Sequence, residues 1–83
     1  MRLPRDLAGK DLATALAAFG YRVTRQTGSH LRLTTPDRGE HHITIPQHHP
    51  LRVGTLAAVL AEVALHFEMS RDDVAKRLFE STR

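Results

Sequence analysis

The chain has 83 residues, which suits one small domain, and we expect a single domain over residues 1–83. It has no cysteine, which excludes disulfides and thiolate metal sites. No apolar run approaches the roughly 18 residues of a membrane span, so we expect a cytoplasmic protein with no membrane partner. Twelve Lys and Arg outnumber nine Asp and Glu, giving a net charge of +3, and six residues are histidine. This balance suits a polyanionic partner.

Apolar residues at helical spacing predict an N-terminal helix over residues 7–19. Leu12, Leu16 and Phe19 fall at i, i+4 and i+7, so they share one face of such a helix. Gly20 follows the last residue of this pattern, as expected of a residue that ends a helix. The helix should therefore pack on the rest of the chain through this single face.

Three segments that alternate apolar and polar residues predict β-strands, over residues 21–26, 29–35 and 41–46. Thr27-Gly28-Ser29 and Pro36-Asp37-Arg38-Gly39 supply the turns between them, which makes the sheet an antiparallel meander. The alternation assigns an inward face to Tyr21, Val23, the stem of Arg25, Leu31, Leu33, Ile43 and Ile45. It assigns the opposite, wetter face to Arg22, Thr24, His30, Arg32, His42 and Thr44.

Two further helices are predicted after a loop over residues 47–53. The first begins at Gly54-Thr55, with Thr55 as N-cap, and carries an apolar stripe of Leu56, Leu60, Val63 and Phe67. Ser70 is the expected N-cap of a short last helix whose apolar residues are Val74 and Leu78. The fold class is therefore α+β. We expect an α-β-β-β-α order with a three-stranded antiparallel sheet, helices on one face and a short extra C-terminal helix, the layout of a double-stranded-RNA-binding domain (dsRBD).

The motif Arg25-Gln26-Thr27-Gly28-Ser29-His30, in this context, resembles the HicA family of ribonuclease toxins from bacterial toxin–antitoxin pairs. The likeness extends to Phe19-Gly20-Tyr21-Arg22-Val23, Ile43-Thr44-Ile45-Pro46 and Gly54-Thr55-Leu56, and covers roughly residues 7–78. The resemblance implies a dsRBD-like fold and a catalytic histidine in Gly-Ser-His, which here is His30. It also implies RNA as substrate and a HicB-like antitoxin as partner. Leu31 departs from many relatives, which have a second histidine there.

The chemistry expected of His30 is general acid and base catalysis on RNA. Neutral imidazole can take the proton of a ribose 2′-OH, and imidazolium can protonate the leaving 5′-oxygen, with a 2′,3′-cyclic phosphate as product. Contacts to RNA are expected from residues near His30 or on its face: Arg22, Arg25, Ser29, Arg32, His42 and His48. Arg32, two residues from His30 on the same strand face, is the best placed to stabilise charge on the scissile phosphate. Lys10 and Arg52 are candidates at the rim.

We expect no metal and no cofactor. His41 and His42 are neighbours on a predicted strand and point to opposite faces, so they cannot share one ion without distortion. Two alternatives to the ribonuclease remain: a non-catalytic RNA-binding module of dsRBD shape, and a degenerate toxin. A dsRBD reads duplex RNA with a Lys-rich cluster at the start of its last helix, but residues 53–58 contain no Lys.

Overall fold

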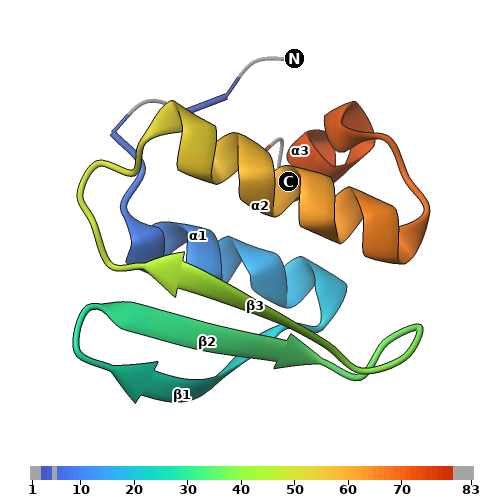
Figure 1. Cartoon of the computed structure of the whole chain (residues 1–83). Helices are drawn as coiled ribbons and strands as arrows, with labels where there is room; N and C mark the ends of the chain where they lie inside the picture. Colours follow the sequence, from blue (N-terminus) through green and yellow to red (C-terminus); the bar gives the residue numbers. More distant parts are fainter. Residues whose placement is uncertain (1–2, 5, 80–83) are drawn as a thin grey trace.

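The computed structural model describes residues 3–4 and 6–79, and it confirms the predicted α+β fold and the order of its elements. Figure 1 shows two layers, with the helices on one side of the sheet. The elements are α1 (Gly9–Ala15), the 3-10 helix η1 (Leu16–Phe19), β1 (Arg22–Thr27), β2 (His30–Thr35), β3 (His41–Pro46), α2 (Val53–Phe67) and α3 (Arg71–Phe79).

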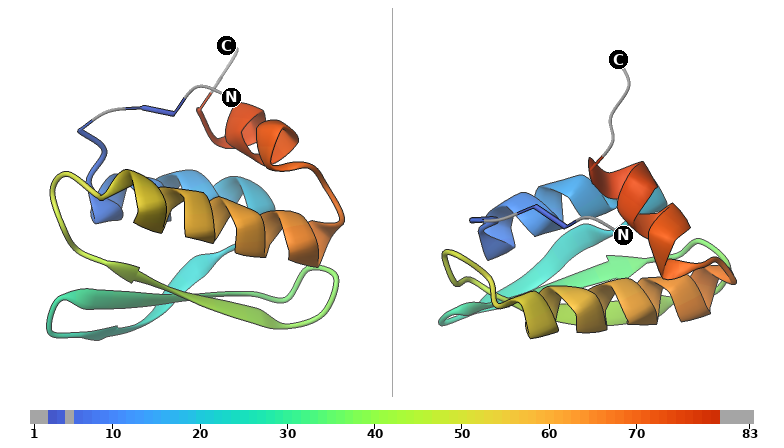
Figure 2. Two further views of the ribbon diagram at one scale, coloured as in Figure 1. Left: turned by 45° about the horizontal axis from the view of Figure 1, so that its top comes forward. Right: turned by 90° about the horizontal axis from the view of Figure 1, so that it is seen from above.

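The sheet is antiparallel, with β2 in the centre and β1 and β3 at its edges. In the register between β2 and β3, Leu31 lies opposite Ile45, and Leu33 lies opposite Ile43. Residues directly opposite each other share a face, and all four are buried beneath the helices. Figure 2 shows from two further directions that the helices lie on this face. The described residues leave the other face uncovered, as predicted.

The core lies between the sheet and the helix layer. Leu12 and Leu16 enter it from the N-terminal helices, Leu60 and Val63 from α2, and Val74 from α3, and each side chain is fully buried. Burial of such a side chain stabilises the fold by roughly 1.5–3 kcal/mol. No single helix in the described ranges is long and apolar enough to cross a membrane, although α2 and α3, bent by 107°, would qualify together by length and composition.

Helix boundaries depart from the prediction at three places. α1 begins at Gly9, two residues late, and its last turn tightens into η1 before Gly20, at φ 83°, ends it. α2 begins at Val53 after Arg52, so the predicted N-cap at Thr55 is wrong. The predicted cap at Ser70 is confirmed, because its Oγ accepts a hydrogen bond of 3.0 Å from the amide of Asp73.

A cluster of rings joins the sheet to α2 at the end of β3 that lies next to the β2–β3 turn. Tyr21 Oη lies 2.7 Å from Nδ1 of His41, and the ring of His41 stacks on that of His66, with centroids 4.4 Å apart. Nε2 of His66 donates to the carbonyl of Asp37 at 2.9 Å. Burial, helped by the charge of Glu62, raises the pKa of Tyr21 to about 12, so the phenol stays protonated and can donate to an unprotonated His41.

This cluster predicts a loss of stability in mild acid. Burial lowers the pKa of His41 below its ordinary value of 6.5; His66 and His42 lower it further, and Glu62 opposes them. The unfolded chain therefore binds a proton at a higher pH than the folded chain. The contribution of His41 is complete above pH 6.5 and is lost as the pH falls through the lowered value. Thermal unfolding at pH 7.5 and pH 5 should show a smaller drop in melting temperature for His41→Gln than for the wild type.

The control for this prediction is His49→Gln. His49 is an exposed histidine in the loop after β3, so its replacement should keep the wild-type drop between the two pH values. An equal drop in the wild type and in His41→Gln would show that acid acts on the fold through another group.

Candidate functional site on the open face of the sheet

His30 stands at the first position of the central strand, immediately after the turn of Gly28 and Ser29; Thr27, predicted in the turn, is the last residue of β1. Gly28 allows the tight reversal, since its φ is 52°, in the left-handed region that glycine adopts without a steric cost. Leu31 and Leu33 are buried beneath the helices, so the alternation of β2 sends the exposed side chain of His30 to the uncovered face. The backbone of a paired central strand thus fixes an imidazole in a position open to a large substrate.

The strand register arranges this uncovered face in three cross-strand rows. The first row contains Thr27, His30 and Pro46; the second contains Arg25, Arg32 and Thr44; the third contains Arg22, Thr34 and His42. Alternate residues of a strand are about 7 Å apart, so this is the spacing between successive rows. We call these three rows, together with Thr24, the open face. The predicted site residues Arg22, Arg25, His30, Arg32 and His42 all lie on it.

A β-bulge at Thr24 changes the prediction for β1. The register shifts between Val23 and Arg25, so Val23 lies opposite Leu33 while Arg25 lies opposite Arg32. The side chain of Arg25 therefore belongs to the open face, and the prediction that its stem faces inward is wrong. Val23 does point to the helix side, but it is 50% exposed because the edge strand extends beyond the helices that cover the core.

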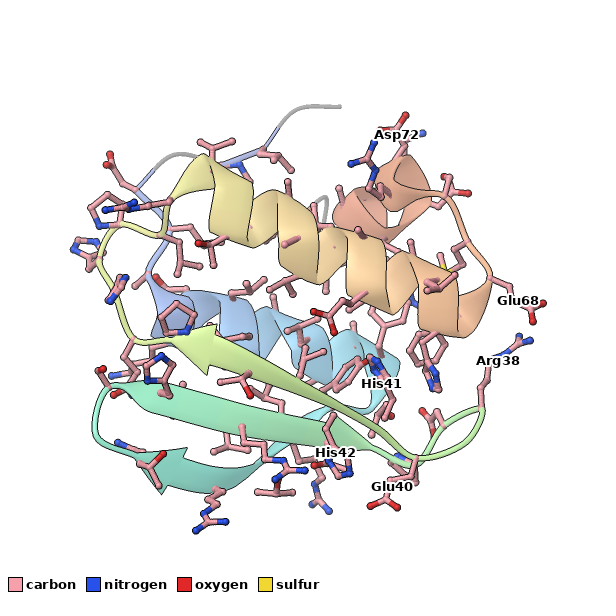
Figure 3. All side chains as sticks on the ribbon, in the orientation of Figure 1. Arg38, Glu40, His41, His42, Glu68 and Asp72 are labelled. Atoms are coloured by element: carbon pink, nitrogen blue, oxygen red, sulfur yellow. The ribbon has the colours of Figure 1, made fainter. Side chains whose placement is uncertain are left out.

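A chain of hydrogen bonds crosses the open face at the bulge. Thr24 Oγ1 lies 2.9 Å from Thr34 Oγ1 and donates to the carbonyl of Arg32 at 3.3 Å. Thr34 Oγ1 in turn lies 2.8 Å from Nδ1 of His42. The other ring nitrogen of His42, Nε2, lies 3.4 Å from the carboxylate of Glu40, and Figure 3 shows this pair beside the β2–β3 turn. These contacts orient His42 and hold the bulged strand against β2.

The open face is basic. Its three rows contain Arg22, Arg25 and Arg32, and none of these three forms an ion pair with a residue in the described ranges. Arg25 and Arg32 are directly opposite each other, and like charges in that arrangement destabilise a sheet. Among the described residues, Glu40 is the only acidic residue with an ion-pair contact to this face, and its partner there is His42. The face should therefore attract anions.

The remaining predicted residues lie at the margin of the site or away from it. Ser29 precedes His30, and its carbonyl accepts a hydrogen bond of 2.6 Å from the amide of Gln47. The main chain of His48 bonds to Gly9 at the start of α1, so this loop turns toward the helix layer and His48 lies outside the three rows. Lys10 lines a hollow of about 470 Å³ with Val23, on the helix side of the sheet. Arg52 occupies the N-cap position of α2, in the helix layer, without a side-chain hydrogen bond to the helix.

No group of three His, Cys, Asp or Glu within the described ranges is placed to hold a metal ion. His41 stacks on His66 of α2 while His42 bonds to Thr34 on the open face, so the two neighbours point to opposite sides of β3 (Figure 3). The arrangement of the open face suits acid–base chemistry on a phosphate chain, with an exposed imidazole and several guanidinium groups.

Comparison with known proteins identifies the family. A family model described as the HicA toxin of bacterial toxin–antitoxin systems matches residues 9–65, which is well over half of the chain. The match extends from the start of α1 into α2 and includes all three strands of the sheet. No curated protein and no solved structure matches. The chain belongs to the HicA toxin family of bacterial toxin–antitoxin systems.

Proposed function

We propose that this protein is an endoribonuclease that cleaves mRNA in the cytoplasm, with His30 as the general acid and base. The observation that carries the proposal is the place of His30: it is exposed at the start of the central strand, on an uncovered face, and the adjacent row contains Arg25 and Arg32, which form no ion pair with a described residue. Family membership supports the same reading, since a toxin must damage a cellular target. A flat, basic face is accessible to an RNA chain.

The reaction that suits this site is transfer of the phosphoryl group to the neighbouring hydroxyl. His30 removes the proton of a ribose 2′-OH, and the 2′-oxygen attacks the adjacent phosphorus. The bond from phosphorus to the 5′-oxygen breaks, and that oxygen takes the proton from the imidazolium of His30, leaving a 2′,3′-cyclic phosphate and a 5′-hydroxyl. Arg32, in the adjacent row, stabilises the charge that develops on the phosphate oxygens. DNA lacks the attacking hydroxyl, so the chemistry selects RNA.

A toxin of a toxin–antitoxin pair has an antitoxin as its partner. We propose that this partner is HicB-like and covers the open face. The face is basic, so the surface that covers it should be acidic and should bind partly through charge. Occupation of the His30 row would exclude RNA directly. Ser29 and His48, at the margin of the face, remain candidate contacts for either ligand.

The products of cleavage test this function. Purified protein should cut RNA in the presence of EDTA, because the proposed steps use only His30, Arg32 and groups of the RNA itself. The 3′ fragments should begin with a 5′-hydroxyl, and mass spectrometry should find cyclic phosphate on the 5′ fragments. A single 2′-deoxy sugar at the cut position should abolish that cut. Activity that returns only with added Mg²⁺ or Zn²⁺ would contradict the mechanism, and tight RNA binding without cleavage would favour a binding module.

A further inference from the structure

The cations of the open face all lie on one side of His30. His30 occupies the first row, beside the turn between β1 and β2; Arg25 and Arg32 occupy the second row, and Arg22 the third. In the other direction β2 begins at His30 itself, and only the turn of Gly28 and Ser29 lies between it and β1.

After β3 the amide of Gln47 donates to the carbonyl of Ser29 at 2.6 Å, and from there the main chain leaves the sheet. It turns to the helix layer, where the carbonyl of His48 accepts a hydrogen bond of 2.9 Å from Gly9 and the amide of Leu51 donates to Leu7 at 2.7 Å. Among the described residues, the register places no charged side chain on the open face beyond the His30 row.

The bulge at Thr24 is what makes the second row doubly charged. Without it, regular alternation would place Arg25 on the helix side, and Arg32 would stand alone beside His30. Two guanidinium groups directly opposite each other repel, and neither has an acidic partner in the described chain. An anion bound between the two groups attracts both of them and so offsets their repulsion. Guanidinium groups match phosphate oxygens in both charge and geometry.

We propose that RNA lies along β2 on a one-sided phosphate track. This rests on the proposed ribonuclease function. The scissile phosphate lies at His30, the next phosphate lies between Arg25 and Arg32, and the one after it lies at Arg22. The row spacing of about 7 Å is close to the separation of successive phosphates in an extended single strand. The described residues therefore bind the RNA phosphates on one flank of the cut and make no ionic contact with the other flank.

Neutralising single phosphates tests this track. In an RNA with one mapped cut, each flanking linkage is replaced in turn by an uncharged methylphosphonate on a 2′-O-methyl sugar, with the same sugar on a normal phosphate as the reference. We expect the first and second linkages on one flank each to lower kcat/KM by about tenfold, the value of one charge-assisted contact. On the other flank the change should stay below about twofold. Equal losses on both flanks would overturn the proposal.

Variants of the protein establish the register of the track. In Arg25→Ala the first linkage of the sensitive flank should matter less than in the wild type, because only Arg32 still contacts it, while the second linkage should matter as much as before. In Arg22→Ala the second linkage should lose its effect while the first keeps it. Lys76→Ala is the matched control, since Lys76 is an exposed cation on α3, away from the sheet, and it should keep the wild-type pattern. If both arginine variants respond to the two linkages as the wild type does, these residues do not bind the assigned phosphates.

Failure of the track and failure of the ribonuclease function remain distinguishable. If the protein cuts RNA but both flanks respond equally, only the track is wrong. If no RNA is cut, the proposed ribonuclease function is wrong, and a measurement of RNA binding still tests the track. A short oligonucleotide made entirely of 2′-O-methyl sugars should then bind Arg25→Ala about tenfold more weakly than wild type by fluorescence anisotropy, and should bind Lys76→Ala equally well. Equal binding by the wild type, Arg25→Ala and Lys76→Ala would contradict the proposed phosphate track as well.

Discussion

Replacing His30 with Ala should abolish RNA cleavage and growth arrest while leaving the fold unchanged. A positioned acid–base group contributes about 10²–10⁴-fold to a rate, and cleavage should fall by that factor. The side chain is exposed and the backbone pairs of His30 do not depend on it, so thermal melting should match the wild type. Both proteins are expressed from a tightly controlled promoter, and growth, RNA integrity and melting temperature are measured.

His49→Ala is the control for the loss of a histidine as such. His49 is exposed in the loop after β3, and its replacement should leave cleavage and growth arrest intact. Undiminished RNA cleavage by folded His30→Ala would remove His30 from the mechanism.

The second large effect is expected from charge reversal at Arg32. Arg32 lies in the second row, opposite Arg25 and next to the row of His30. Arg32→Glu removes a phosphate contact and adds a repulsive charge, so RNA cleavage should fall by about 10²-fold. The antitoxin is proposed to cover the same face with an acidic surface, and its affinity should fall in the same variant. Titration calorimetry and a cleavage assay measure the two effects separately.

Arg77→Glu provides the comparison on the helix side of the molecule. The guanidinium of Arg77 lies over the ring of Phe19, 4.9 Å from its centroid, so its loss should cost about 0.5–1 kcal/mol of stability. It should affect neither cleavage nor antitoxin binding. Tight antitoxin binding by Arg32→Glu together with weak binding by Arg77→Glu would place the inhibitory interface on the helices instead.

The order of elements was predictable because local patterns and tertiary burial agree. Leu31 and Leu33 alternate as a half-buried strand requires, and Leu12 and Leu16 follow helical spacing; all four are buried as expected. The start of α2 was not predictable in this way. Thr55 has the chemistry of an N-cap, but the helix begins two residues before it, after Arg52, without a side-chain cap. Packing of Leu51 and Leu56 in the core accompanies this earlier start.

The composition of the site was only partly readable from sequence. His30 and Arg32 lie where period-two alternation sends them, but Arg25 does not, because alternation carries no sign of an extra residue at Thr24. The contact between Tyr21 and His41 and the stack of His41 on His66 were also missed. Those residues are far apart along the chain, and only the docking of α2 on the sheet brings them together.

The bulge at Thr24 also affects how molecules of this protein behave toward one another. β1 is an edge strand, and all six of its residues are exposed. A regular edge of this kind offers an evenly spaced row of free amides and carbonyls, on which a strand from another copy can add. The extra residue breaks that spacing and increases the local twist, while Arg22 and Arg25 add like charges. The bulge that brings Arg25 onto the open face thus also protects the sheet against edge-to-edge aggregation.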